Sequence, residues 1–144
     1  MKLSIEYIAG FVDGEGCIYA QVRPNQRLDT KLIITNTDLS VLKDIQEFFG
    51  CGTIRLKSRG STDRARKTCY LYEVWAQEAA DVITKLLPYL RQKKPQAELI
   101  LELREYCLSR KNYAIGRSGT VPLSEEEKEK RAVYVNKIKE LKRA

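Results

Sequence analysis

The chain has 144 residues, 43% of them hydrophobic, so it can form one domain with a buried core and is too short for two domains of ordinary size. Lys and Arg number 26 against 19 Asp and Glu, and the net charge of +7 favours a polyanionic partner such as nucleic acid. The sequence has no histidine, which excludes a serine–histidine triad and the histidine–metal nucleases and leaves hydrolytic chemistry to carboxylates, metal, water and lysine.

The four cysteines lie far apart in the chain, and with no histidine to join them a zinc site is not expected. No apolar leader follows Met1, and the longest apolar runs are too short to span a bilayer. We therefore expect a soluble, intracellular protein without a membrane partner, either in a prokaryotic cytoplasm or in an organelle. Its thiols should be free and buried.

Residues 5–15 are predicted to form a short helix that is apolar on nearly every side. The helical period places Ile5, Ile8 and Val12 on one apolar stripe. It places Ala9, Gly10 and Asp13 on a second face. Such a helix must be buried on several sides, and small residues let a second backbone come close. We expect it to pair with a copy of itself through Ala9, Gly10 and Asp13.

The rest of the chain shows two hairpin patterns, each followed by apolar positions at helical spacing. In chain order we expect strands over 17–23 and 28–35, a helix from the N-cap Asp38 to Gly50, strands over 53–57 and 68–75, and helices over 79–87 and from Pro95 onward. The order αββαββα predicts an α+β fold with a four-stranded antiparallel sheet, helices on one face and extra C-terminal helices.

The C-terminal part begins with a polar, glycine-containing stretch that is typical of a linker. Ser124 and Glu127 then have the spacing of a capping box and start a highly charged helix. We assign residues 1–110 to the core domain, and residues 111–144 to this linker and helix, packed on the same domain. The basic end of the helix is either a solvated face or a contact with phosphates or a partner.

One face of the predicted sheet is free of helices and carries long hydrogen-bonding side chains. Such side chains can pair with base edges, and a two-stranded ribbon fits the major groove of DNA. Antiparallel sheets also show a polar face to water for no further reason, but the basic loops favour double-stranded DNA as the partner here. The predicted DNA-contact residues are Tyr19, Gln21, Arg23, Asn25, Gln26, Arg27, Asp29, Lys31, Arg55, Lys57, Arg59, Arg66, Thr68, Tyr70 and Tyr72.

Glu15 stands between two glycines, which favour the end of the helix and leave room beside its carboxylate. The partial negative charge of a helix C-terminus and the carboxylate together attract a hard cation such as Mg²⁺. One carboxylate is too few for such a site, but two copies of the helix crossing at a two-fold axis would bring two Glu15 side chains together. The alternative is an ordinary turn with Glu15 in water.

The run Ile8-Ala9-Gly10-Phe11-Val12-Asp13-Gly14-Glu15-Gly16 resembles the motif of the LAGLIDADG homing endonucleases. The resemblance covers residues 1–110 and a single motif copy, as in the subgroup whose members act as homodimers on long, nearly palindromic DNA sites. It implies a metal-dependent double-strand break that leaves short 3′ overhangs and serves intron homing. The implied cofactor is Mg²⁺ or Mn²⁺, with Ca²⁺ as a non-catalytic substitute.

The same resemblance implies roles for individual residues. Glu15 and the main-chain carbonyl of Gly14 match the metal ligands, although many relatives have Asp in place of Glu. Lys93 matches a lysine near the scissile phosphate, Asp38 matches a polar position that orients the attacking water, and Asp13 matches an acidic position that supports the helix pair. Simpler roles are a helix C-terminal contact for Lys93 and an N-cap for Asp38.

Two other interpretations stay open on the sequence. The first is a DNA-binding regulator or an intron RNA maturase on the same fold, which would bind without cleaving and would add intron RNA as a partner. The second is a basic α+β domain whose first helix pairs with an unrelated protein. Metal-dependent nicking separates the first from a nuclease, and the salt dependence of DNA binding separates the second.

Overall fold

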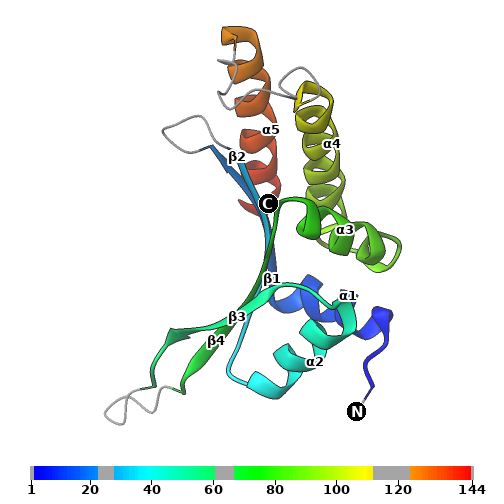
Figure 1. Ribbon diagram of the computed structural model, residues 1–144, viewed down its shortest axis with the longest axis vertical. Helices are drawn as coiled ribbons and strands as arrows, with labels where there is room; N and C mark the ends of the chain where they lie inside the picture. Colours follow the sequence, from blue (N-terminus) through cyan, green and yellow to red (C-terminus); the bar gives the residue numbers. More distant parts are fainter. Residues whose placement is uncertain (1, 23–27, 61–66, 112–123, 144) are drawn as a thin grey trace.

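The computed structural model describes residues 2–22, 28–60, 67–111 and 124–143, with side chains described as far as residue 106 in the third range and 142 in the last. The elements are α1 (Ile5–Glu15), β1 (Gly16–Val22), β2 (Leu28–Asn36), α2 (Leu39–Phe49), β3 (Thr53–Ser58), β4 (Cys69–Trp75), α3 (Ala76–Leu86), the 3₁₀ turn η1 (Leu87–Tyr89), α4 (Lys94–Lys111) and α5 (Glu125–Arg143). Figure 1 shows their arrangement. The predicted αββαββα order is confirmed.

The four strands form one antiparallel sheet in the order β1-β2-β4-β3. The two hairpins of the sequence therefore lie side by side, and β2 pairs with β4 at the centre. Helices α1, α2, α3 and α4 lie on one side of the sheet (Figure 1). The other face carries none of these helices, as the sequence predicts.

The hydrophobic core lies between the sheet and the helices. Strands β1, β2 and β4 contribute alternate residues to it, because successive side chains of a strand point to opposite faces. Core residues of the sheet are Ile18, Ala20, Leu32, Ile34, Tyr72 and Val74, and among those of the helices are Ile8, Val12, Leu42, Ile45, Ile83, Leu86, Ile100 and Leu103. Full burial of a side chain of this size contributes about 1.5–3 kcal/mol relative to exposure, so this layer is the main source of stability.

Helix α5 shares the same core. Val135 and Ile138 are 5% and 1% exposed and belong to the cluster that α1 and the sheet form. The helix begins with the predicted capping box, since the Ser124 hydroxyl accepts a hydrogen bond from the Glu127 main-chain N–H at 3.2 Å. Helices in the described part of the chain lack the combination of length and apolar character that crossing a membrane requires.

The turn after α2 is built from glycines. Gly50 ends the helix in the left-handed region, at φ 68°, as predicted. Gly52 has φ 92°, and a Cβ atom there would lie 2.6 Å from the Tyr72 ring. The Tyr72 hydroxyl donates a hydrogen bond to the Cys51 carbonyl at 2.9 Å, and burial raises the pKa of this hydroxyl, so it remains a donor. Tyr72 thus anchors the turn that leads into β3.

Candidate functional site

The first helix passes into the first strand without a linker. Helix α1 ends at Glu15 and β1 begins at Gly16, whose main-chain N–H still donates to the Val12 carbonyl. A Cβ atom at position 16 would lie 2.8 Å from that carbonyl oxygen, closer than real Cβ contacts come. Glycine is therefore required here by close approach, and the exposed Glu15 side chain lies at the junction of helix and sheet.

A distant segment is bound to this junction. The Asp13 carboxylate accepts hydrogen bonds from the main-chain N–H groups of Arg91 and Lys93, at 2.8 and 3.0 Å. The Lys93 ammonium group in turn donates to the main-chain carbonyl of Asp13. Lys93 is also the residue before α4, and its carbonyl accepts the hydrogen bond of the Ala97 N–H at 2.9 Å. Lys93 is thereby bound to the residue two positions before Glu15, at the N-terminal end of α4.

The donors at this junction suit a hard cation. The Glu15 carboxylate is exposed, and Gly14 beside it is open, because a Cβ atom added there would meet nothing within 4 Å. Oxygen donors of this kind are those that Mg²⁺ prefers, and the helix C-terminus adds partial negative charge. Within the ranges that the structure describes, three or more His, Cys, Asp or Glu side chains never gather as a metal site. One chain thus offers one carboxylate and main-chain carbonyls.

Helix α1 presents a different surface from the one predicted. The assignment of Ala9 to the association face is wrong, because Ala9 is 0% exposed and belongs to the core with Ile8 and Val12. The Asp13 carboxylate is committed to its own chain, as described above. Gly10 and Gly14 are exposed and open, and Tyr7, three residues before Gly10, is 48% exposed. These three residues form the exposed stripe of α1.

Asp38 has the simpler of its two predicted roles. It is the N-cap of α2, and its carboxylate accepts hydrogen bonds from the Ser40 main-chain N–H at 2.9 Å and from the Ser40 hydroxyl. These bonds, that of the hydroxyl first, lower the pKa of Asp38. These are the bonds of an N-cap, and the role of Asp38 in orienting the attacking water stays a prediction.

The free face of the sheet contains five of the ten predicted contact residues that the structure describes: Tyr19, Gln21, Asp29, Lys31 and Arg55. Cross-strand partners share a face, and the register pairs Tyr19 with Lys31, Gln21 with Asp29 and Arg55 with Leu71. Lys57 lies at an irregularity of β3, Arg59 is exposed in the following loop, and the Thr68 hydroxyl accepts a hydrogen bond from the Gly60 N–H. Five predicted residues lie outside the described ranges: Arg23, Asn25, Gln26, Arg27 and Arg66.

The orientation predicted for β4 is wrong. Tyr70 and Tyr72 point to the helices, where Tyr70 packs against the core and Tyr72 is 0% exposed, so neither side chain belongs to the free face. Glu73 and Trp75 lie on the free face instead, opposite Ile33 and Lys31 of β2. A signal was present in the sequence: Glu73 is the one charged residue of this strand, whereas a tyrosine ring is suited to either side.

Comparison with known proteins identifies the family. The sequence profile described as LAGLIDADG endonuclease matches residues 8–107. The chain belongs to this family. It is 32% identical to DNA endonuclease I-CvuI of Chlorella vulgaris over 110 residues. This match covers 71% of the chain and 64% of the relative. It is also 32% identical over 113 residues to DNA endonuclease I-CreI of Chlamydomonas reinhardtii, covering 73% of the chain and 64% of the relative.

Solved structures of LAGLIDADG proteins have the same fold. A crystal structure of I-CvuI in complex with its target in the presence of Ca has a TM-score of 0.64 and 25% identity, and 94% of each chain is covered. The homing endonuclease I-TnaI, at 20% identity, has a TM-score of 0.67 over 99% of this chain and 96% of the other. The α+β architecture of the LAGLIDADG fold is therefore confirmed.

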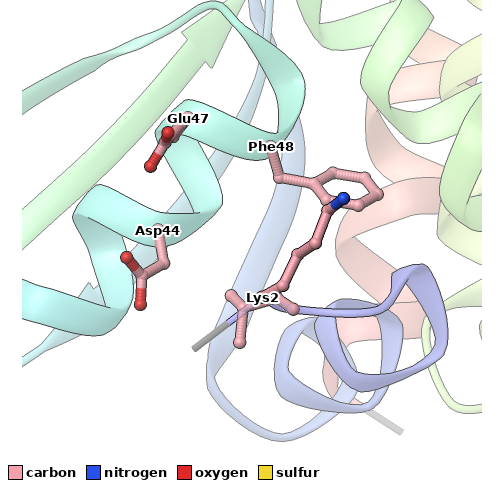
Figure 2. A pocket seen from close by; sticks show the side chains of 5 residues that line it. Lys2, Asp44, Glu47 and Phe48 are labelled. Carbon is pink, nitrogen blue, oxygen red and sulfur yellow. The ribbon is translucent and has the colours of Figure 1, made fainter.

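This LAGLIDADG chain has a further pocket away from the junction. Figure 2 shows it between the N-terminal segment and α2, with Lys2 extending toward the Phe48 ring and the carboxylates of Asp44 and Glu47 on the outer side of the helix. Its lining contains neither Glu15 nor Lys93. The junction, not this pocket, is the candidate active site.

Proposed function

We propose that this protein is a site-specific DNA endonuclease, which makes a metal-dependent double-strand break in a long, nearly palindromic site as a homodimer and leaves short 3′ overhangs. The observation that carries the proposal is the junction at the end of α1. There the exposed Glu15 carboxylate, the Lys93 ammonium group and the open Gly14 lie beside the start of the polar sheet face. Family membership and the naming of both relatives as DNA endonucleases support it.

Each residue of the junction has a physical task in phosphodiester hydrolysis. Glu15 and the Gly14 carbonyl would hold a divalent cation, Mg²⁺ or Mn²⁺, whose chemistry is to lower the pKa of a water molecule and offset phosphate charge. The Lys93 ammonium group would place a fixed positive charge near the scissile phosphate, beside the positive end of α4. The hydrogen bonds that Lys93 donates to Asp13 hold this lysine there before DNA arrives, so no reorganisation of the lysine is needed.

A second copy of the chain would complete the site. One junction offers one carboxylate, whereas pairing through the exposed stripe of α1 would place two Glu15 side chains at one axis. Open space around Gly10 and Gly14 permits close approach of a second backbone. The free face of the sheet would then lie along the DNA on both sides of the axis, which matches a nearly palindromic site.

The deciding experiment is cleavage of a plasmid library that carries randomised inserts, with the purified protein and either Mg²⁺ or EDTA. Linear products with short 3′ overhangs, formed with Mg²⁺ only, support the proposal and identify the target. Binding of inserts without any nick would instead establish the DNA-binding regulator or, if intron RNA is preferred, the maturase.

The variant Glu15→Gln tests the role of the carboxylate. We expect cleavage of the recovered target to fall by at least about 10²–10³-fold, because a charged ligand is lost, while affinity changes less than about threefold. The matched control is Glu47→Gln, which removes the same charge from the exposed side of α2 and should cleave normally. Undiminished cleavage by Glu15→Gln would show that another group holds the metal.

A further inference from the structure

The free face of the sheet carries a buried carboxylate that the proposed reaction does not use. Glu73 lies in the central strand β4, opposite Ile33 of β2 and Thr53 of β3. In the described part of the chain it is the one carboxylate that is buried, at 2% exposure, although helices α1 to α4 all lie on the opposite face. An ionised carboxylate is tolerated in such a place only when cations and donors satisfy it.

Three side chains from three strands satisfy Glu73. The Lys31 ammonium nitrogen lies 3.5 Å from Oε1, and the Arg55 Nη2 atom lies 3.3 Å from Oε2. The Trp75 indole N–H donates to Oε1. We call these four residues the Glu73 cluster. It joins β2, β3 and β4 at the middle of the surface that the proposed function places against DNA.

The cluster holds its two cations in different ways. The Lys31 side chain is 18% exposed, and its ammonium group lies 5.9 Å from the ring centroids of both Tyr19 and Trp75, so its position is fixed. The Arg55 side chain is 64% exposed and keeps donors free for another partner. A guanidinium group held by one carboxylate can present its remaining donors to a base edge, whereas an unrestrained one finds phosphates of any sequence.

We propose that Glu73 is a specificity-determining residue that acts by positioning Lys31 and Arg55. The inference rests on the proposed function and names the part of the interface that separates target from non-target DNA. The carboxylate directs the two cations toward base edges. It also cancels one positive charge, which weakens the sequence-independent attraction to the phosphate backbone.

The test compares Glu73→Gln with the matched control Glu47→Gln, which makes the same charge change on α2. Binding is measured with Ca²⁺ on the duplex recovered from the library and on a shuffled duplex of equal length and composition. We expect Glu73→Gln to bind the shuffled duplex about tenfold more tightly and to lose about tenfold in discrimination. Its salt dependence should steepen by about one counterion per protomer. A purely structural role of Glu73 would change neither the ratio of the affinities for the two duplexes nor the slope of the salt dependence.

Each outcome decides the question. An unchanged ratio for Glu73→Gln, or an equal change for Glu47→Gln, overturns the proposal. If Glu73→Gln does not fold, Trp75→Phe removes one donor and keeps the carboxylate, and a loss of about threefold in discrimination supports the proposal while no loss overturns it. If the wild-type protein binds both duplexes equally, the proposed function itself has failed, which is a distinct result.

Discussion

Asp13 connects parts of the chain that are 78 and 80 residues apart in sequence. Its carboxylate binds the main chain at Arg91 and Lys93, and its carbonyl receives the Lys93 ammonium group. The family motif supplies this acidic residue, but its role here lies within one protomer, since the side chain holds the lysine segment against the end of α1. The position of Lys93 therefore depends on a residue that does not itself touch the phosphate in the proposed reaction.

We predict that Asp13→Ala lowers single-turnover cleavage of the recovered target by about 10–100-fold, because Lys93 loses its fixed position. The free energy of unfolding should fall by about 2 kcal/mol, since hydrogen bonds to a charged group are lost. Urea denaturation and quenched-flow cleavage measure the two effects. The control Asp81→Ala removes an exposed carboxylate of α3 that bonds Gln77 within the helix, and it should change neither. Normal cleavage by Asp13→Ala would contradict the positioning role.

For individual residues, the sequence predicted the kind of side chain at the site better than the position of that side chain in the fold. The residue types of the junction follow from the motif, and Lys93 was found by resemblance. Ala9 was misplaced because it stands at the edge of the helical stripe of Ile8 and Val12, where a small apolar residue suits either side. Asp38 is an N-cap, as one of its two predicted roles requires, and its catalytic role stays a prediction, since an N-cap and a water-orienting carboxylate have the same residue type.

The two sides of helix α1 differ in their surroundings. One side packs on the core of its own chain, and the other leaves two glycines open. A helix surface with Tyr7, Gly10 and Gly14 exposed offers apolar contact and close approach together. Side chains do not fill the space above either glycine. The exposed stripe is therefore suited to another helix of the same kind.

We predict that Gly10→Leu converts the proposed homodimer to a folded monomer. A Cβ atom at position 10 meets nothing within 4 Å, so the leucine fits the isolated chain and interferes only with a partner helix. Sedimentation velocity gives the mass and circular dichroism the helix content. Lys43→Leu, which adds the same side chain to an exposed position of α2, should leave the dimer intact. A dimer of Gly10→Leu would mean that association uses another surface.

Strand β4 shows why element order was easier to predict than orientation. Hairpins and helices follow from alternation and turn residues, and these patterns were sufficient for the topology. In β4, apolar or aromatic residues stand at both parities, so alternation alone gives two answers. Tyr72 lies in the interior, because its ring covers Gly52 and its hydroxyl donates a hydrogen bond to the Cys51 carbonyl. Those contacts depend on a turn about 20 residues away, which no local pattern contains.

At the scale of the whole molecule, one core joins the sheet to helices from both ends of the chain. Val135 and Ile138 of α5 lie in the same cluster as Ile8 of α1. The cluster thus contains residues from before and after the 112–123 segment in the sequence, which itself lies outside the described residues. Residues 111–144 were predicted to pack on the core domain, and a thermodynamic test can decide whether the two parts unfold together.

We predict that Ile138→Ala lowers the free energy of unfolding of the entire chain by about 2–5 kcal/mol, because a buried side chain at 1% exposure is truncated. Denaturation followed by far-ultraviolet circular dichroism and by Trp75 fluorescence should give one coincident transition. The exposed neighbour Lys139→Ala should have an effect below about 0.5 kcal/mol. A separate early transition of the helix, with the sheet unaffected, would show that α5 is an independent unit.

Because α1 passes directly into β1, the position of a residue in β1 sets the distance of its side chain from Glu15. Cys17, Tyr19 and Gln21 share one face of β1, and a strand rises about 3.3 Å per residue, so these side chains follow Glu15 at intervals of roughly 7 Å. In the proposed complex, inserting one residue into β1 would turn every following side chain to the opposite face, and inserting two would displace each of them by one interval. Such a protein can acquire a new DNA sequence preference by exchanging side chains at these fixed positions, whereas a change in strand length would shift the base contacts relative to the site of cleavage.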